Sequence, residues 1–416
     1  MMAVFGLNGL RALRTRWSYS YTVLLLCWFG WISIYLCKSV LPPVLPILLD
    51  ELGITHAQAG MFATVYLIGY VLVKIPAGML ARRIGIRNTL LLGMIGYGLS
   101  TMLNAVAATF LQILVLRFFV GLFQGIHLPV ANTLLSERFK GAQGKVIGFH
   151  ESGPNIGNAM ALPLTVAIAS AWSWRWAFLL LSLPAFALAL ATFITLKEDE
   201  RKVESDERGK TDPMGGLGLR SFCRLLIPLA MAHAVYNLCL RTLFTFAPIY
   251  LVEFRGMSLG MAGLISMILP AAGFFAKISS GFIAERLGRR NAICAATALS
   301  GAFIASLIRF RGECGLSLAF MMIGLVLYSF SPTIYASVTS ALPFHLKSMG
   351  LGVVTMTGNL VGAISTPIVG FLIDAYGYNA ALLSISATTL IATAVIYLAM
   401  KREPEIGVQQ DGVAVG

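Results

Sequence analysis

The sequence predicts an all-α membrane protein with twelve transmembrane helices, arranged as two pseudo-symmetric bundles of six. Three observations lead to this prediction: the composition, a series of apolar stretches of spanning length, and an internal repeat. The 416 residues are 57% hydrophobic and only 12% charged. Because soluble proteins carry about 25% charged residues, this composition is typical of a chain that lies largely within a lipid bilayer.

The apolar stretches are each close to the ~20 residues that a spanning helix needs. We expect spans at about 19–41, 58–80, 89–108, 111–133, 145–169, 175–196, 225–251, 260–284, 291–309, 316–338, 350–373 and 379–400. The longest polar stretch, 197–224, is charged and then glycine-rich, which is typical of a linker. It divides an N-terminal bundle (1–196) from a C-terminal bundle (225–400), and 401–416 forms a tail.

The distribution of basic residues predicts the orientation. Most of the 31 lysines and arginines fall in segments on the side of both termini, and few fall in the opposite loops. By the positive-inside rule, both termini are expected in the cytoplasm. We further expect the chain to lie in the cell membrane as a monomer. The excess of basic residues in the predicted cytoplasmic segments accounts for the net charge of +13. No nucleic-acid partner is therefore expected, and the lipid bilayer is the expected surrounding of the chain.

An internal repeat supports two equivalent halves. Residues 74–88 read KIPAGMLARRIGIRN and residues 277–291 read KISSGFIAERLGRRN, which are identical at eight of fifteen positions. The offset of 203 residues also pairs Gly53 with Gly256. Parallel repeats of six helices, related by an axis along the membrane normal, are a transporter architecture with a central site at their interface.

Lysine and arginine side chains inside spans are the main functional signal. The same offset pairs Lys38 with Arg241 and Lys74 with Lys277, so each half carries cations at equivalent depths. A cation in hydrocarbon is costly, and Glu151 is the only acid that we place within a span. These residues could snorkel to an interface or pair with a structural acid. We favour a cationic cavity wall that receives an anion.

Other polar residues on the central helices are candidates for hydrogen bonds to a substrate, although each could equally serve helix packing. The candidates are Tyr35, Tyr66, Tyr236, Asn155 and Asn359. In the fifth predicted helix, GFHESGPNIGNAMALPLT (148–165), His150 and Glu151 are adjacent and cannot both point at one spot. Glu151 could carry a proton or hold a cation between transport events, and we slightly prefer the ion pair.

The repeated loop gives the sequence a recognisable family resemblance. GMLARRIGIRN (78–88) and GFIAERLGRRN (281–291) resemble the G-x-x-x-D-R-x-G-R-R loop of the major facilitator superfamily, and RFFVGLFQG (117–125) resembles its fourth-helix motif. The resemblance implies that Arg117 and these loops serve gating or coupling, and the alternative for Arg117 is a structural hydrogen bond to carbonyls. The loop residues concerned are Gly78, Arg83, Arg87, Gly281, Glu285, Arg286 and Arg290. Arg82 stands where the family loop usually has an aspartate. The resemblance therefore does not carry over the family's acid-dependent cytoplasmic gate to the first half.

A narrower resemblance concerns the embedded cations. YLCK (35–38), KIPAG (74–78) and Arg241 with FAPIYLVE resemble the first, second and seventh helices of organophosphate:phosphate antiporters and related organic-anion carriers. In those carriers, basic residues of the first and seventh helices grip the substrate anion. The resemblance therefore implies this role for Lys38 and Arg241. Lysine acts as a point charge where arginine binds phosphate bidentately, which weakens the phosphate-specific version.

These observations predict a secondary active transporter rather than an enzyme. The sequence has no GxxxxGK[ST], HExxH or GxSxG motif, and its six cysteines have no CxxC spacing, so no cofactor or metal is expected. The substrate is predicted to be a small organic anion, a carboxylate or phosphate ester, moved by proton or ion symport or by exchange. The alternatives are a proton-coupled exporter of drugs or metabolites, and a non-transporting receptor on the same fold.

Overall fold

The computed structural model describes residues 18–139, 143–197, 219–342 and 344–400, and within these ranges the chain is helical without strands. The first half comprises α2 (Tyr19–Ser39), α3 (Leu41–Leu52), α4 (His56–Leu72), α5 (Lys74–Ile84), α6 (Ile86–Leu103), η1 (Asn104–Val106), α7 (Phe110–Gln124), α8 (His127–Arg138), α9 (Gln143–His150), α10 (Gly153–Ala171) and α11 (Trp174–Thr195). The second half comprises α12 (Leu219–Ile249), η2 (Tyr250–Phe254), α13 (Leu259–Leu287), α14 (Arg289–Ser306), α15 (Glu313–Ala341) and α16 (Phe344–Ala399).

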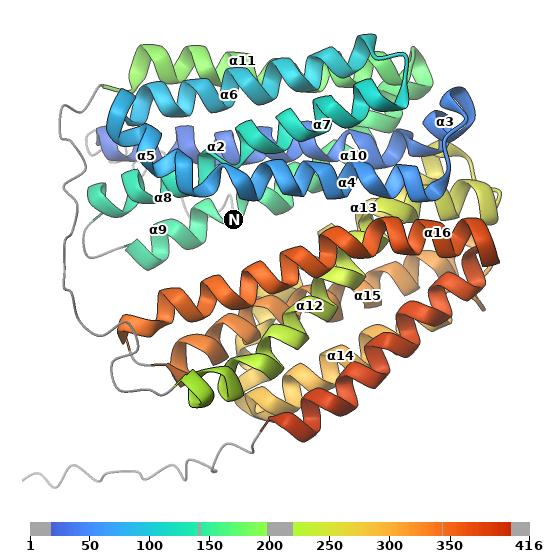
Figure 1. The fold of residues 1–416 in the computed structure, drawn as a ribbon. Helices are drawn as coiled ribbons and strands as arrows, with labels where there is room; N and C mark the ends of the chain where they lie inside the picture. The colour runs from blue at the N-terminus through green and yellow to red at the C-terminus, as the bar shows by residue number, and fades with distance from the viewer. Residues whose placement is uncertain (1–17, 140–142, 198–218, 343, 401–416) are drawn as a thin grey trace, which may run out of the picture.

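The helices form two bundles that meet at one end and diverge at the other (Figure 1). They meet where α3 and the start of α4 approach the middle of α16, at the right of the figure. They diverge where α5, α8 and α9 lie opposite the start of α12, at the left. The backbone N–H of Lys197, just after α11, donates to the hydroxyl of Tyr19 at the start of α2 at 2.8 Å. The diverging end is therefore the end from which the linker begins.

The helices follow the predicted spans, although proline and glycine break several of them. Eight helical segments in the described ranges are long and apolar enough to cross a membrane alone, and one of these, Met349–Ala399, contains two arms joined at Gly377. Gly377 has φ 78°, a conformation that other residues rarely adopt. The prediction of separate spans at 350–373 and 379–400 therefore agrees with two arms of α16. Within the predicted span 145–169, a turn at Glu151 and Ser152 separates α9 from α10.

The internal repeat is visible in the backbone. Gly53 and Gly256 end equivalent segments with φ of 59° and 65°. Gly85 and Gly288 occupy the repeated loops with φ of 85° and 75°. Each pair is 203 residues apart, so both halves turn at the same points with glycines in the left-handed region. Most of the linker, 198–218, and the tail, 401–416, lie outside the described residues.

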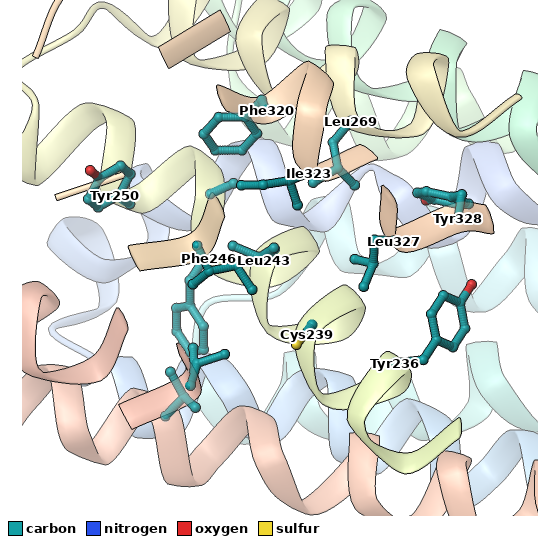
Figure 2. Close-up of a cluster of buried hydrophobic side chains, with 14 of the residues drawn as sticks. Tyr236, Cys239, Leu243, Phe246, Tyr250, Leu269, Phe320, Ile323, Leu327 and Tyr328 are labelled. Carbon is teal, nitrogen blue, oxygen red and sulfur yellow. The ribbon is translucent and has the colours of Figure 1, made fainter. Parts of the chain in front are cut away.

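The core of the second half leads from a dry interior to a polar wall (Figure 2). Cys239, Leu243 and Phe246 of α12 pack with Phe320 and Ile323 of α15, and all five are buried. Tyr236 and Tyr328 continue the same helix faces at the right of the view. Since no hydrophobic gain drives helices together in lipid, close packing of this kind holds the bundle. Large apolar side chains on the outside, such as Ile194 and Leu398, suit contact with lipid.

Candidate functional site

A cavity of about 420 Å³ lies between the two halves. This volume is within the usual range for small-molecule sites. Its described lining includes five lysine and arginine side chains and no aspartate or glutamate. The polar lining residues are Tyr35, Lys38, Tyr66, Tyr70, Lys74, Arg117, Asn155, Asn158, His233, Tyr236, Asn237, Arg241, Thr245, Lys277, Tyr328, Tyr335, Thr355 and Asn359. All nine residues predicted to bind substrate are in that set.

Lys38 reaches this cavity from the end of α2. Its ammonium nitrogen lies 4.6 Å from the ring centroid of Tyr35 and 5.5 Å from that of Tyr66. Ring faces attract a cation through their quadrupole, by about 0.5–2 kcal/mol. They do not cancel its charge, however, so the ammonium group remains able to attract an anion.

Arg241 reaches the cavity from α12 in the other half. Its Nε donates to Asn237 Oδ1 at 3.2 Å and its Nη2 donates to Asn359 Oδ1 at 2.9 Å. Gly362 of α16 makes room for this side chain, because a Cβ at that position would lie 2.5 Å from the Arg241 Cδ. The two amides fix the guanidinium in place without neutralising it.

Lys74 and Lys277 form a second cationic group in the cavity. The ammonium nitrogen of Lys74 lies 4.7 Å from the ring centroid of Tyr70, which is one helical turn earlier in the chain. Lys277 of α13 donates to Asn155 Oδ1 of α10 at 3.2 Å, and this contact joins the two halves. Within the described residues, neither lysine forms an ion pair at salt-bridge distance.

Glu151 is an acid that interacts electrostatically with both Lys277 and Lys74. It lies in the turn between α9 and α10, its side chain is 46% exposed, and it is not among the described lining residues. The adjacent His150 is fully buried, and its Nδ1 lies 4.0 Å from the Glu151 Oε1, at the limit of ion-pair distance. Pro154 explains the turn, because it has no N–H to continue the helical hydrogen bonds of α9.

His150 belongs to a buried cluster behind the cavity. Its Nε2 lies 3.3 Å from Nε2 of His127, which in turn lies 3.1 Å from the carbonyl oxygen of Cys27. The Trp31 ring stacks on both imidazoles, with centroids 5.3 Å from His127 and 5.8 Å from His150. The sequence analysis gave His127 no role, and a lone histidine in an apolar span offers no signal of such a pairing.

Arg117 is only 2% exposed, and its position follows from a proline in α3. Pro42 has no N–H, so the carbonyl of Lys38, four residues earlier, has no helical donor at that position. The Nη1 of Arg117 donates to this carbonyl at 3.2 Å. Its Nε and Nη2 have no hydrogen-bond partner among the described residues. Arg117 therefore supports the break in the first span and adds an unneutralised charge to the cavity wall.

The end at which the halves meet carries a polar cluster that the sequence analysis missed. His56, the first residue of α4, contacts Asp374 Oδ1 through Nδ1 at 2.6 Å and Glu253 Oε2 through Nε2 at 2.8 Å. The backbone N–H of His56 and that of Ala57 both donate to the Asp374 carboxylate at 3.0 Å. Tyr378 donates to Glu253 at 2.7 Å. No local pattern signals contacts between residues about 200–320 positions apart.

Backbone packing continues this closure, and we call the region the sealed end. A Cβ at Gly60 would lie 2.6 Å from the Thr366 backbone, and a Cβ at Gly370 would lie 2.3 Å from the His56 carbonyl. Thr64 donates to the carbonyl of Ala363 at 2.5 Å. Helices α4 and α16 thus touch through their main chains, which only small residues permit.

The predicted gating residues of the two repeated loops lie at the diverging end and are not among the described lining residues. Arg83 and Arg286 are exposed, and a Cβ at Gly78 would have nothing within 4 Å. Arg87 lies 5.5 Å from the Phe193 ring centroid, whereas Arg290 donates to the carbonyl of Tyr397 at 2.6 Å. For Gly281 and Glu285, the helical backbone of α13 is described but the side-chain surroundings fall outside the described residues.

The chain is similar to several proteins of known activity or structure. Over 377 residues it is 24% identical to the D-galactonate transporter of Escherichia coli O6:H1, covering 82% of this chain and 86% of that protein. It is 23% identical to the probable galactarate/D-glucarate transporter GudP of Bacillus subtilis, covering 82% and 83%.

Its fold matches that of a solved bacterial homologue of the human lysosomal transporter Spinster, in an inward-facing and unoccupied conformation. The TM-score is 0.80 at 18% identity, and the match covers 92% of this chain and 97% of that one. The sequence profile of the Major Facilitator Superfamily matches residues 27–366 and 280–414. Two six-helix halves, a repeated glycine loop and a cavity between them agree with that profile, and this chain belongs to the major facilitator superfamily.

Proposed function

We propose that this protein is a secondary active transporter of a small organic anion, a carboxylate or a phosphate ester. One observation carries the proposal: the cavity between the halves is lined by five lysine and arginine residues and, within the described lining, by no acid. Lys38 and Arg241 come from opposite halves and are held by uncharged partners. An anion between them would be attracted by both halves at once.

The similar proteins support this substrate class. The D-galactonate transporter and the probable galactarate/D-glucarate transporter are both named for sugar acids, which are organic anions at neutral pH. A proton-coupled exporter of cationic drugs would need acids in the cavity, because a buried cationic ligand requires a partner charge. The lining residues supply the opposite charge.

The transport cycle follows from the arrangement of the halves. With both termini in the cytoplasm, as the distribution of basic residues predicts, the diverging end would face inward and the sealed end outward, which would make this an inward-facing state. Rocking of the two bundles around the cavity would expose it to either side. Transport would be driven by symport with a proton or ion, or by exchange of anions. Glu151, His150 and Arg117 are the proposed coupling residues, and the repeated loops form the inner gate.

The test is ligand-induced thermal stabilisation of the purified protein, followed by flux into liposomes. Small carboxylates and phosphate esters would be screened beside lipophilic cations. We expect at least one anion to stabilise the wild type and the control Arg311→Gln, which removes an exposed cation outside the cavity. The same anion should fail to stabilise Lys38→Gln and Arg241→Gln. Stabilisation by lipophilic cations alone, or an unchanged response of both cavity variants, would sink the proposal.

A further inference from the structure

The charge of the cavity exceeds what one carboxylate can balance. Lys38, Lys74, Arg241 and Lys277 line it, and Glu151 is the acid that interacts with two of them. Their other contacts are with rings and amides, which leave the charges in place. Lys38 and Arg241 repel each other, and so do Lys74 and Arg241. Like charges in a partly dry site are costly, and the cost falls as opposite charge enters.

Four of the five lining cations fall into two groups at different depths, and the fifth, Arg117, binds the carbonyl of Lys38. Lys38 lies against Tyr66 and Lys74 against Tyr70. The two rings stack with centroids 6.1 Å apart. Four residues of helix separate these tyrosines, a rise of about 6 Å. The groups are therefore offset along α4 by approximately one helical turn.

The repeat gives each depth a cation from both halves. Lys38 and Arg241, which repel each other, form the deeper group, and Lys74 and Lys277, which both interact with Glu151, form the group nearer the diverging end. Two anionic groups joined by a short chain match this offset: an extended six-carbon chain, with bonds of about 1.5 Å, separates its terminal carbons by roughly 6 Å. The ring of Tyr70 and the amide of Asn155 lie beside the second group, where they can contact the middle of such a molecule.

We propose that the substrate is a dianion with its two acidic groups at opposite ends, one bound by Lys38 and Arg241 and the other by Lys74 and Lys277. This inference rests on the proposed function and narrows its substrate class. A monoanion would occupy the deeper group and leave the second pair balanced by Glu151 alone. The second anionic group of a dianion would neutralise the charges of Lys74 and Lys277. It would also link α5 of one half to α13 of the other.

The test compares two acids that differ in one carboxyl group. D-galactonate and galactarate share a six-carbon polyol, with one carboxylate in the first and two in the second. Their affinities would be measured by thermal stabilisation and calorimetry on the full chain in lipid nanodiscs. We expect galactarate to bind about tenfold more tightly, as one added charge interaction of about 1–2 kcal/mol gives. Sulfate, whose charges share one centre, should not match galactarate.

Variants separate this inference from the proposed function. The double variant Lys74→Gln/Lys277→Gln should bind galactarate and D-galactonate within about twofold of each other, because the second anionic group loses its cations. Arg311→Gln should keep the wild-type preference. Equal binding of the two acids by the wild type, or equal binding of sulfate and galactarate, would overturn the dianion while an organic-anion carrier still stood. A protein that no organic anion stabilises would overturn both.

Discussion

At the scale of single residues, a missing hydrogen-bond donor explains the position of a buried charge, Arg117. Pro42 leaves the Lys38 carbonyl without its helical partner, and Arg117 supplies one from α7. The same break lets α2 end at Ser39, so that Lys38 lies on its last turn and reaches the cavity. One proline thereby links a structural arginine to a proposed binding lysine.

This link predicts energetic coupling between Pro42 and Arg117. Pro42→Ala restores an N–H that can donate to the Lys38 carbonyl, so losing the arginine then costs less. We expect Arg117→Met to lower the free energy of unfolding by about 1–2 kcal/mol more in the wild-type background than in the Pro42→Ala background. Thermal or denaturant unfolding of the purified variants measures this difference.

Pro46→Ala is the matched control, because Pro46 lies in the same helix but would pair with a different carbonyl. It should show no coupling to Arg117→Met. Additive effects of Pro42→Ala and Arg117→Met would mean that the arginine does not compensate for the proline.

At the scale of helices, the sealed end depends on the contact between α4 and α16. Gly60 and Gly370 place the two main chains in contact, and Thr64 and Thr366 add hydrogen bonds to carbonyls of the opposite helix. Within the first half, Gly69, Gly121 and Gly125 hold α4 against α7 in the same way. Helix α4 is therefore expected to move with its own bundle, and the α4–α16 contact is one that must open.

A side chain at Gly60 should hold this contact open. In Gly60→Val the added Cβ meets the Thr366 backbone, which cannot rotate away as a flexible side chain can. We expect a cysteine introduced at Ala363, which is 7% exposed, to react several-fold faster with a maleimide added from the sealed end. Gly352→Val is the control, since a Cβ there has nothing within 4 Å. An unchanged rate in Gly60→Val would show that the glycine contact does not determine the seal.

At the scale of the whole molecule, one histidine links the two halves. The Nδ1 and Nε2 atoms of His56 each lie within hydrogen-bond distance of a carboxylate, from Asp374 and Glu253. A neutral imidazole can donate from only one nitrogen, so both contacts are satisfied only when the ring is protonated. Tyr378 also faces this histidine, at 3.0 Å. We call His56, Asp374 and Glu253 the latch. The latch with a protonated His56 therefore favours the state described here.

This arrangement predicts that acid at the sealed end favours the state described here. Raising the pH removes the imidazolium proton and one of the two contacts, so the sealed end should open more often as the pH rises. Labelling of the cysteine at Ala363 should be faster at alkaline than at acidic pH, after correction for thiol reactivity with a free thiol. His56→Gln should label faster than wild type at acidic pH and lose most of the dependence. A dependence that persists in that variant would place the titrating group elsewhere.

The repeat explains how much could be predicted. A fixed offset of 203 residues implies a symmetric fold, so pairing Lys38 with Arg241 and Lys74 with Lys277 was enough to place all four around one cavity. The roles assigned to them stay predictions. The latch at His56 could not be predicted, because its partners are set by how the halves dock and not by any local pattern. The turn after His150 could have been anticipated from Pro154, which removes a helical donor.

The close packing of α4 against α16 also bears on the ion gradients across the cell membrane. A cell membrane stores free energy as ion and voltage gradients, and any continuous file of water through a carrier dissipates them. The main-chain contacts at Gly60 and Gly370 leave no room for a file of water between α4 and α16 at these two points. The glycines therefore help to keep the closed carrier impermeable to water and ions. A substitution that disrupts this packing is expected to make the membrane leaky, even if the carrier still binds its substrate.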